Sequence, residues 1–372
     1  MKEKEITDRA YEISEQAEEV NQDYIVRLGK HIKYLEEQDE IDPVYVENRT
    51  QDDIKQIQKN VRNKCIIMTG MTIALYHNHA GDIYAESKKY YAHRGITQVP
   101  YYQNTTINAY MNTVAQRTQL AFDNISRTTV VDKAYRDAVD ESVALIQSGK
   151  SNYDREIRRI LANSAIEGTR VQYASGMTRR MDSACRMNIL EGVRRIDADV
   201  RRAVGKEFGA DGMEISAHAL CAVDHQDIQG EQYSMSDYEN LNNSLDRPIG
   251  ELNCQHYATP IILGISEPVY DEDELDGFRN YSEEEIDING KSISRYECSQ
   301  LMRQLETNVR YQKDALLMAK ASGDKVAQKE AKAKIAKYKG RYDYVCKQSG
   351  LPPQPKRMSV PSRTAGYVDK MK

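Results

Sequence analysis

Apolar residues recur at spacings of three and four along the first forty residues, as on one face of an α-helix. The positions in this stripe are Ile13, Ala17, Val20, Tyr24, Leu28, Ile32 and Leu35. They predict a helix from Thr7 to Gln38. Asp42-Pro43 interrupts the pattern, and the acidic residues of Thr50-Gln51-Asp52-Asp53 are typical of a first helical turn. We therefore expect a second helix to begin there and to continue through Met68.

Helical patterns continue to about residue 209. Residues 95–104 form a connector around Pro100, and helices are predicted over about 105–126 and 129–148, with Ser148-Gly149 as a stop signal. A long helical stretch is expected from Ser151 to Gly209, punctuated by Gly168 and Gly176. Together these patterns predict a helical region over residues 1–205.

The pattern changes after Gly209-Ala210-Asp211-Gly212. Met213, Ile215 and Ala217 alternate with other residues as in a half-buried strand, and residues 260–265 predict a short buried strand. A compact module of mixed helix and strand is therefore expected over residues 206–270.

The last third of the chain divides by charge and periodicity. Residues 267–287 carry ten carboxylates, whose repulsion opposes compaction, so we predict an acidic linker over 271–290. Helical periodicity then returns and is interrupted at Ala321-Ser322-Gly323-Asp324, which predicts an antiparallel helical hairpin over 291–350. A basic, flexible tail is expected over 351–372. The predicted fold class is α+β and mostly helical.

Composition adds limits on the class of protein. The chain has 25 Tyr, 3 Phe and no Trp, and tyrosine suits wet interfaces as well as the edge of a helical core. Six scattered cysteines favour reduced thiols over a disulfide framework. The charged amino terminus lacks the apolar run of a signal peptide, and no later segment is long and apolar enough to span a bilayer. We expect a soluble cytoplasmic protein that has no membrane partner.

The net charge of −5 conceals two regions of opposite charge. Residues 291–372 contain 19 Lys and Arg against 7 Asp and Glu, a net charge of +12, which leaves −17 for residues 1–290. Such a basic region can contact nucleic acid, an acidic partner or a neighbouring copy. The candidate contacts for DNA or a partner are Lys332, Lys334, Lys337, Lys339, Arg341, Lys356, Arg357 and Arg363.

Four arginines form a second candidate surface. They are Arg179, Arg186, Arg194 and Arg201, which advance by seven or eight residues. On a straight helix they would occupy one stripe, next to an apolar face. The stripe could bind phosphates or the carboxylates of a partner. The alternative is a solvated face that pairs with acidic residues of the same helix.

Three histidines and two cysteines are concentrated in a short part of the predicted module. They are His218, Cys221, His225, Cys254 and His256. Neutral imidazole and thiolate are the usual zinc ligands, which raises the hypothesis of a structural zinc ion. Two alternatives stay open. A cysteine could act as a nucleophile with a histidine base that Asp224 orients, or the thiols could be small buried hydrophobes held in a hydrogen-bonded loop.

Residues 173–195, from Tyr173-Ala-Ser-Gly to Glu-Gly-Val-Arg-Arg195, resemble the helix that marks the phage minor capsid protein family. Further similar blocks follow in the family's order, so that the resemblance covers about residues 170–268. They are residues 207–225, 227–234, 247–256 and 261–264. The segment that begins at Tyr296 resembles the family's carboxyl-terminal part.

A more distant similarity links the module to the head-morphogenesis proteins of Mu-like phages. Their terminal block reads Asn-Cys-Arg-Cys, whereas Gln255 and His256 occupy the last two positions here. A metal site borrowed from a cysteine pair in those relatives would therefore lack one of its cysteines in this chain.

The resemblance implies a structural protein of a tailed-phage head rather than an enzyme, without a cofactor. It would be present in few copies, bind the portal protein and other capsid or scaffold components, and assist head assembly, DNA packaging or genome ejection. Its location would be the virion, after assembly in the host cytoplasm. Packaged DNA is a further partner that the basic tail suggests. No phosphate-binding loop, zinc-protease helix or nucleophile-elbow motif is found in the sequence.

Overall fold

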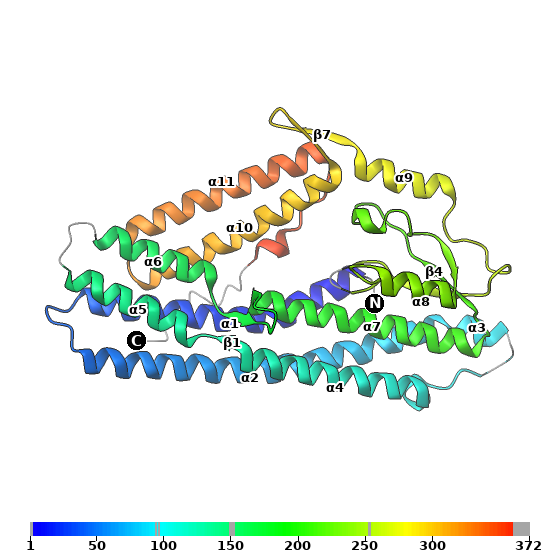
Figure 1. Ribbon diagram of the computed structural model, residues 1–372, viewed down its shortest axis with the longest axis horizontal. Helices are drawn as coiled ribbons and strands as arrows, with labels where there is room; N and C mark the ends of the chain where they lie inside the picture. Colours follow the sequence, from blue (N-terminus) through cyan, green and yellow to red (C-terminus); the bar gives the residue numbers. More distant parts are fainter. Residues whose placement is uncertain (1–2, 94, 96, 149–152, 252–253, 360–372) are drawn as a thin grey trace. The chain divides into compact units, whose positions relative to one another are not determined.

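The computed structural model describes residues 3–93, 95, 97–148, 153–251 and 254–359 (Figure 1). The described chain is mostly helical with small antiparallel sheets, which confirms the predicted fold class. Its contacts divide it into two compact units, each made of three sequence segments. The first unit comprises residues 1–13, 69–121 and 186–299, and the second comprises residues 14–68, 122–185 and 300–372. The linear division expected from the sequence therefore stays a prediction.

In the second unit, the apolar stripe of helix α1 (Glu3–Glu36) is buried as predicted. Leu28, Ile32 and Leu35 are at most 1% exposed. Helix α2 (Pro43–Glu86) begins seven residues before the predicted start. The reason is a cap: the Asp42 carboxylate accepts a hydrogen bond from the Val44 N–H at 2.9 Å. Proline is well suited to the first helical position because its missing N–H needs no partner there.

A three-stranded sheet interrupts the stretch that was predicted to be helical from 151 to 209, so that prediction was wrong in part. Helix α6 (Tyr153–Glu167) ends at Gly168, which has a φ of +58° and so cannot continue a helix. The chain then forms a β-hairpin before α7 (Met181–Glu207). The strands, in sheet order, are β1 (Thr129–Val130), β2 (Arg170–Gln172) and β3 (Thr178–Arg180).

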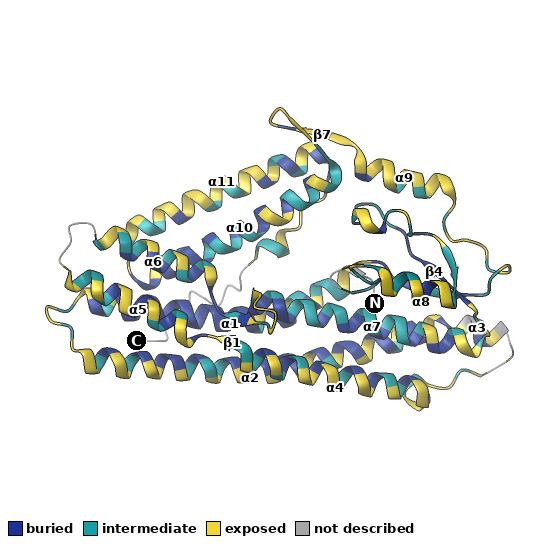
Figure 2. Cartoon of the chain, in the orientation of Figure 1, coloured by how far each residue is buried: buried dark blue, intermediate teal, exposed yellow. Residues whose placement is uncertain are grey.

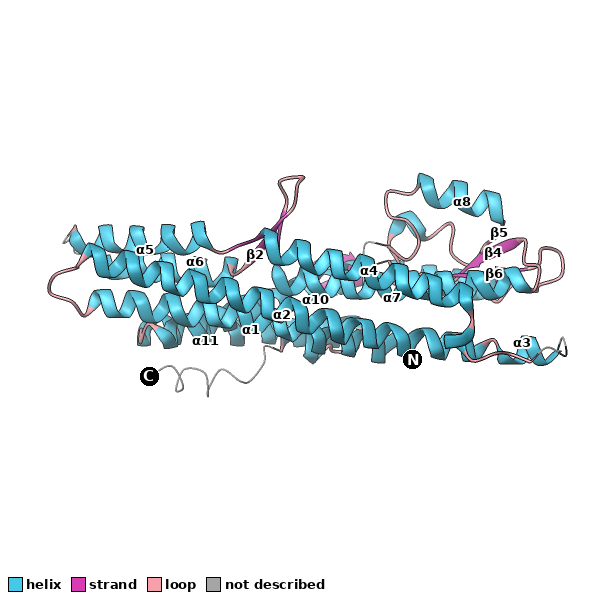
Figure 3. Cartoon of the chain, turned by 90° about the horizontal axis from the view of Figure 1, so that it is seen from below, coloured by secondary structure: helices cyan, strands magenta, loops and turns pink. Residues whose placement is uncertain are grey.

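The helices around this sheet follow the predicted ranges closely. They are α4 (Thr105–Thr128) and α5 (Asp132–Gln147). Helices α5 and α6 lie side by side within the second unit (Figure 3). Their buried side chains, which include Tyr135 and Leu161, belong to the apolar core of that unit.

Helices α10 (Arg295–Ala321) and α11 (Lys325–Ser349) run side by side and confirm the predicted hairpin (Figure 1). The Asp324 side chain caps α11 by accepting hydrogen bonds from two backbone N–H groups of its first turn. Gly350 ends the helix with a φ of +70°. One side of α11 is largely exposed (Figure 2).

The first part of the predicted flexible tail packs on the hairpin, which corrects that prediction for residues 351–359. A 3-10 turn, η3, forms over Pro355–Met358. The backbone N–H of Gln354 donates to the Tyr342 hydroxyl at 2.7 Å. The residues that follow, Arg363 among them, lie outside the described residues.

In the first unit, α7 packs its predicted apolar face inward. Ile189, Val193 and Ile196 are buried, and the Tyr76 hydroxyl of α2 donates to the Ile189 carbonyl at 3.1 Å. Smaller elements complete this helical part: α3 (Lys88–His93) and the 3-10 turn η1 (Tyr101–Gln103).

The predicted mixed module contains a three-stranded antiparallel sheet in the first unit. Strand β4 (Gly212–Ile215) lies between β5 (Gln232–Ser234) and β6 (Ala258–Ile261), with helix α8 (Met235–Ser244) after β5. The last strand ends three residues before Gly264, which has a φ of +72°. It is therefore shorter at its carboxyl end than predicted.

The acidic segment 271–290 forms regular structure instead of a surface loop, and its role as a linker stays a prediction. It forms helix α9 (Glu272–Glu283) and strand β7 (Glu285–Ile288), which pairs with β8 (Lys291–Ser294). Asp271 accepts a hydrogen bond from the Glu274 N–H, and the Glu274 carboxylate accepts one from the Asp271 N–H. Acidic side chains in a first turn are stabilised by the helix dipole, which offsets their repulsion.

Two sequence expectations concern the whole chain. Among the described helices, none combines the length and apolar character needed to cross a membrane. All six cysteines lie in the described part of the chain and are free thiols, as expected.

Candidate metal centre

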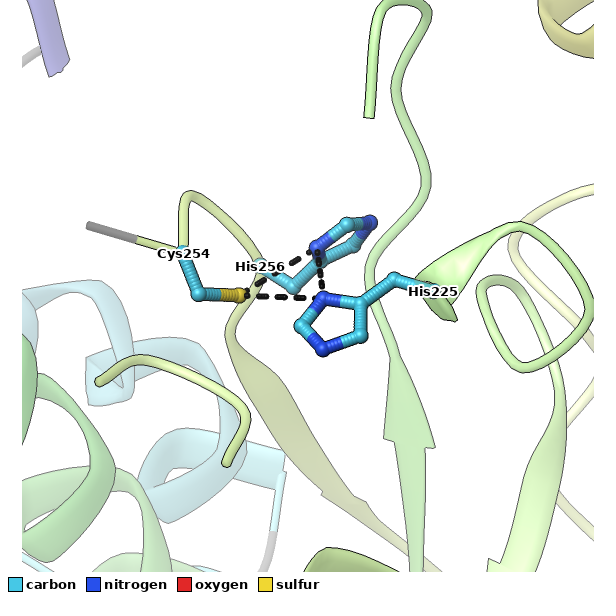
Figure 4. A group of neighbouring side chains, drawn as sticks. All are labelled: His225, Cys254 and His256. Carbon is cyan, nitrogen blue, oxygen red and sulfur yellow. Dashed lines mark hydrogen bonds between the residues drawn. The ribbon is translucent and has the colours of Figure 1, made fainter. Parts of the chain in front are cut away.

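Three of the five predicted ligands meet beside the small sheet of the first unit (Figure 4). His225 ends the 3-10 turn η2 (Val223–His225), and Cys254 and His256 lie just before β6. The Cys254 Sγ is 3.5 Å from the Nδ1 of His225 and 3.4 Å from the Nδ1 of His256. The two Nδ1 atoms are 3.4 Å apart. Three potential ligand atoms thus form a nearly equilateral triangle.

All three side chains are removed from solvent. His225 and His256 are 2% exposed and Cys254 is 6% exposed. Cys254 also belongs to the apolar core of the module, together with Met213, Ile215, Tyr238, Ile249 and Ala258. A nucleophile that attacks an external substrate needs access to it, so this burial favours a structural role for Cys254.

Hydrogen bonds on the outer edge of each ring fix its orientation. The Nε2 of His225 lies 2.9 Å from the Arg247 carbonyl oxygen, and the Nε2 of His256 lies 3.2 Å from the Gln229 Oε1. The same Oε1 accepts the backbone N–H of His218 at 3.1 Å, which identifies it as the oxygen of the amide. Both Nε2 atoms therefore donate, and both Nδ1 atoms face the thiol.

Arg247 connects this arrangement to Asp224. Its guanidinium Nε is 3.2 Å from an Asp224 carboxylate oxygen. Burial raises the pKa of Asp224, but Arg247 and His225 outweigh burial and lower it. Asp224 lies 3.9 Å from the Nε2 of His225, beyond hydrogen-bond reach. Asp224 therefore makes no hydrogen bond to the His225 ring, and its orientation of a histidine base stays a hypothesis.

The other two predicted ligands do not join the three-residue group. The ring of His218 stacks on that of His256, with centroids 4.3 Å apart, and its Nδ1 lies 2.8 Å from the Ala219 carbonyl oxygen. Its Nε2 is buried with no hydrogen-bond partner in the described part of the chain. Cys221 is buried apart from the group, and burial raises the pKa of its thiol to about 11.

The electrostatics of the group favour a neutral His256 and a proton shared between Cys254 and His225. Burial, together with His218 and His225, lowers the pKa of His256 to about 3, so this ring is neutral near pH 7. Burial raises the pKa of the Cys254 thiol, but its contact with His225 and hydrogen bonds from the backbone outweigh burial and lower it. The hydrogen bond with Cys254 raises the pKa of His225. These shifts favour a thiolate at Cys254 beside a protonated His225.

The predicted arginine stripe is incomplete because Arg179 lies in β3, before α7 begins. Within the first unit, Arg186 stacks on Tyr11 with its guanidinium carbon 4.4 Å from the ring centroid. Arg201 pairs with Asp197 at 2.8 Å, and Arg194 is partly buried. The Arg201–Asp197 pair is of the kind expected for a helix face that pairs with acidic residues of the same helix.

The basic candidates of the second unit are more exposed. Five exposed residues lie on α11, on either side of the helix face that buries Ala331 and Tyr342. They are Lys332, Lys334, Lys337, Lys339 and Arg341. Lys356 is exposed on η3, whereas Arg357 lies 3.9 Å from the Glu306 carboxylate. The structure places these residues and leaves their role in DNA binding a prediction.

Gln229 and Arg247 are part of the candidate site, and sequence reasoning missed both as supporting residues. Glutamine and arginine are not usual zinc ligands, and neither residue lies at a spacing typical of a metal-binding motif. No sequence motif therefore indicates them. Gln229 is 4% exposed. The one available signal was physical: buried imidazoles need acceptors for their outer N–H groups, and loop carbonyls and amides are the usual choice.

Comparisons with known proteins address the class of the chain. The family model described as phage minor capsid protein 2 matches residues 21–345. Neither the curated proteins nor the solved structures yield a significant match. The matched range contains the candidate centre, α2, α10 and most of α11.

Proposed function

Because this chain belongs to the phage minor capsid protein 2 family, we propose that it docks at or near the portal of a tailed-phage head. There it assists head assembly, DNA packaging or genome ejection as a component of the virion. The family match over residues 21–345 carries this proposal. A structural capsid role also favours docking over catalysis.

An exposed apolar surface on α2 supports docking. Ile66 and Ile67, which belong to the second unit, are 67% and 45% exposed in the middle of the helix. A single exposed apolar residue is common, but two neighbouring isoleucines on one helix face favour an interaction surface. We therefore propose Ile66 and Ile67 as the centre of the portal contact.

Co-expression with the portal protein of the same phage tests the proposal. The chain is expected to co-elute with the portal ring in size-exclusion chromatography with mass readout, and to stay bound at raised salt because the contact is apolar. Elution as a free chain at both low and high salt would overturn portal docking.

A pair of matched variants tests the location of the contact. Ile66→Asp with Ile67→Asp places charge on the proposed surface, whereas Ile265→Asp places charge on an apolar residue that is even more exposed, at 76%, in another part of the chain. The double variant is expected to lose co-elution and the control to keep it. Equal behaviour of the two would remove this surface from the proposal.

DNA binding through the hairpin is a second candidate, favoured by the charge of α11. This helix carries eight Lys and Arg residues against one Glu and one Asp. The exposed positions offer backbone phosphate contacts, while nothing in their arrangement favours the reading of base sequence.

Salt dependence distinguishes the second candidate from the first. If the hairpin binds DNA, affinity falls steeply with salt, and replacing Lys334, Lys337 and Arg341 by Gln reduces the slope of log affinity against log salt by about 2–3. A slope that these replacements leave unchanged would exclude α11 as the DNA contact.

A further inference from the structure

We propose that His225, Cys254 and His256 bind one zinc ion through Nδ1, Sγ and Nδ1, with a water molecule as the fourth ligand. The ion would serve as a structural cross-link inside the small module. The inference rests on the geometry of the three side chains and is independent of portal docking.

The triangle of ligand atoms has the size of one face of a zinc tetrahedron. Zinc bonds of about 2.0–2.1 Å to nitrogen and about 2.3 Å to sulfur, at tetrahedral angles, place two nitrogens about 3.3–3.4 Å apart and nitrogen and sulfur about 3.5–3.6 Å apart. The observed separations are 3.4 Å between the two nitrogens, and 3.4 and 3.5 Å between nitrogen and sulfur. The three side chains therefore need almost no movement to bind the ion.

Without a metal, the three ligand atoms have too few hydrogen-bond donors for their lone pairs. Both imidazoles use their Nε2–H groups for Arg247 and Gln229, so each Nδ1 of a neutral ring presents a lone pair. The thiol has one proton to share between two such nitrogens. A second lone pair would then be buried without a donor, which is costly. A cation accepts all three lone pairs at once.

The surroundings suit histidines that bind a metal. The outer N–H groups of both rings have carbonyl acceptors, which is usual for a zinc-bound imidazole. Apolar residues such as Ile215 and Ile249 pack around Cys254. Two ligands precede β6 and the third ends η2, so the ion would join two loops that the sheet alone leaves separate.

Binding requires loss of the one proton that the Cys254 Sγ and the His225 Nδ1 share. As the zinc–sulfur and zinc–nitrogen bonds form, this proton passes to solvent, and no oxidation or reduction occurs. Two nitrogen–zinc bonds form from lone pairs that are already directed at the site.

Metal content and a cobalt spectrum of the full chain test the proposal. The purified protein is expected to contain about one zinc ion per chain, and replacement of zinc by Co²⁺ should give a sulfur-to-cobalt charge-transfer band. Removal of metal by a chelator should lower the unfolding temperature, and added Zn²⁺ should restore it. Negligible metal together with an unfolding temperature that Zn²⁺ does not change would overturn the proposal.

Matched variants locate the site. Cys254→Ser is expected to abolish the charge-transfer band, while Cys221→Ser, which removes another buried thiol of the same module, should keep it. Gln229→Ala leaves all three ligands in place and should weaken zinc binding about 10–100-fold through loss of the outer hydrogen bond. Far-UV circular dichroism of each variant controls for folding. Equal loss of the band in Cys221→Ser and Cys254→Ser would contradict the assignment.

Discussion

Gly192 in α7 leaves the space that Tyr76 of α2 occupies in the first unit. A Cβ at position 192 would lie 1.9 Å from the Tyr76 hydroxyl oxygen, which is held by its hydrogen bond to the Ile189 carbonyl. Glycine at this position is therefore a packing requirement, although glycine within a helix is otherwise unfavourable.

Gly192→Ala is expected to lower the free energy of unfolding by about 1–3 kcal/mol, because Tyr76 must shift within a packed core. Gly340→Ala is the control, since Gly340 lies within α11 and has no heavy atom within 4 Å of its added Cβ. The control should raise stability by up to about 1 kcal/mol. Urea unfolding measures both, and changes of the same sign would contradict the packing argument.

His31 of α1 makes the second unit sensitive to acid. Its side chain is fully buried, and burial together with the Arg49 charge lowers its pKa to about 4. In the unfolded chain the pKa is about 6.5. Between these values the unfolded chain binds the proton and the folded chain does not, so stability present above pH 6.5 is lost as the pH falls toward 4.

Between pH 6.5 and pH 4, His31 lowers the free energy of unfolding by up to about 3 kcal/mol. His31→Leu cannot take up a proton, and its stability should fall less than that of the wild type between pH 6.5 and pH 4. Denaturant titrations at several pH values measure the difference. Parallel pH profiles for the two proteins would show that His31 does not carry the effect.

At the scale of elements, Arg180 holds β3 to α1 and α10 in the second unit. It is 7% exposed, and its guanidinium contacts Asp314 at 2.6 Å, Glu18 at 3.1 Å and Asp182 at 3.2 Å. Burial raises the pKa of Glu18 and of Asp314, and the proximity of the carboxylates adds to this effect. The network therefore depends on Arg180 to offset its negative charge.

Arg180→Met should destabilise the protein by about 3–5 kcal/mol, because it leaves buried carboxylates without their partner. Arg136→Met removes a more exposed arginine that pairs with Asp132 at 2.7 Å and Glu47 at 3.0 Å, and should cost less than about 1 kcal/mol. Thermal and denaturant unfolding provide the comparison. A similar small cost for both would mean that the buried network is dispensable.

Long periodic elements were predictable from the sequence. The stripe of α1 and the break at Ala321–Asp324 each depend on spacing that only a helix explains. The β-hairpin before α7 was missed because Val171 and Thr178 belong to strands of only three residues, too short to show alternation. The acidic helix α9 was missed because charge density was weighed above the capping residues Asp271 and Glu274.

At the scale of the molecule, the candidate centre was predictable as a cluster but not as a geometry. The density of Cys and His between residues 218 and 256 indicated ligands, and three of the five meet in space. The pairing of β4 with β6 determines which three meet, and the spacing of residues in the sequence does not reveal this long-range contact. The position of Gln229 beside the ligands depends on the same pairing.

We propose that this minor capsid protein joins the head by docking at or near the portal. Quantitative mass spectrometry of heads purified with and without the portal gene measures its copy number and so tests the docking. We expect a few copies per head when the portal is present and essentially none in portal-less heads. Equal amounts in both kinds of head would contradict portal docking.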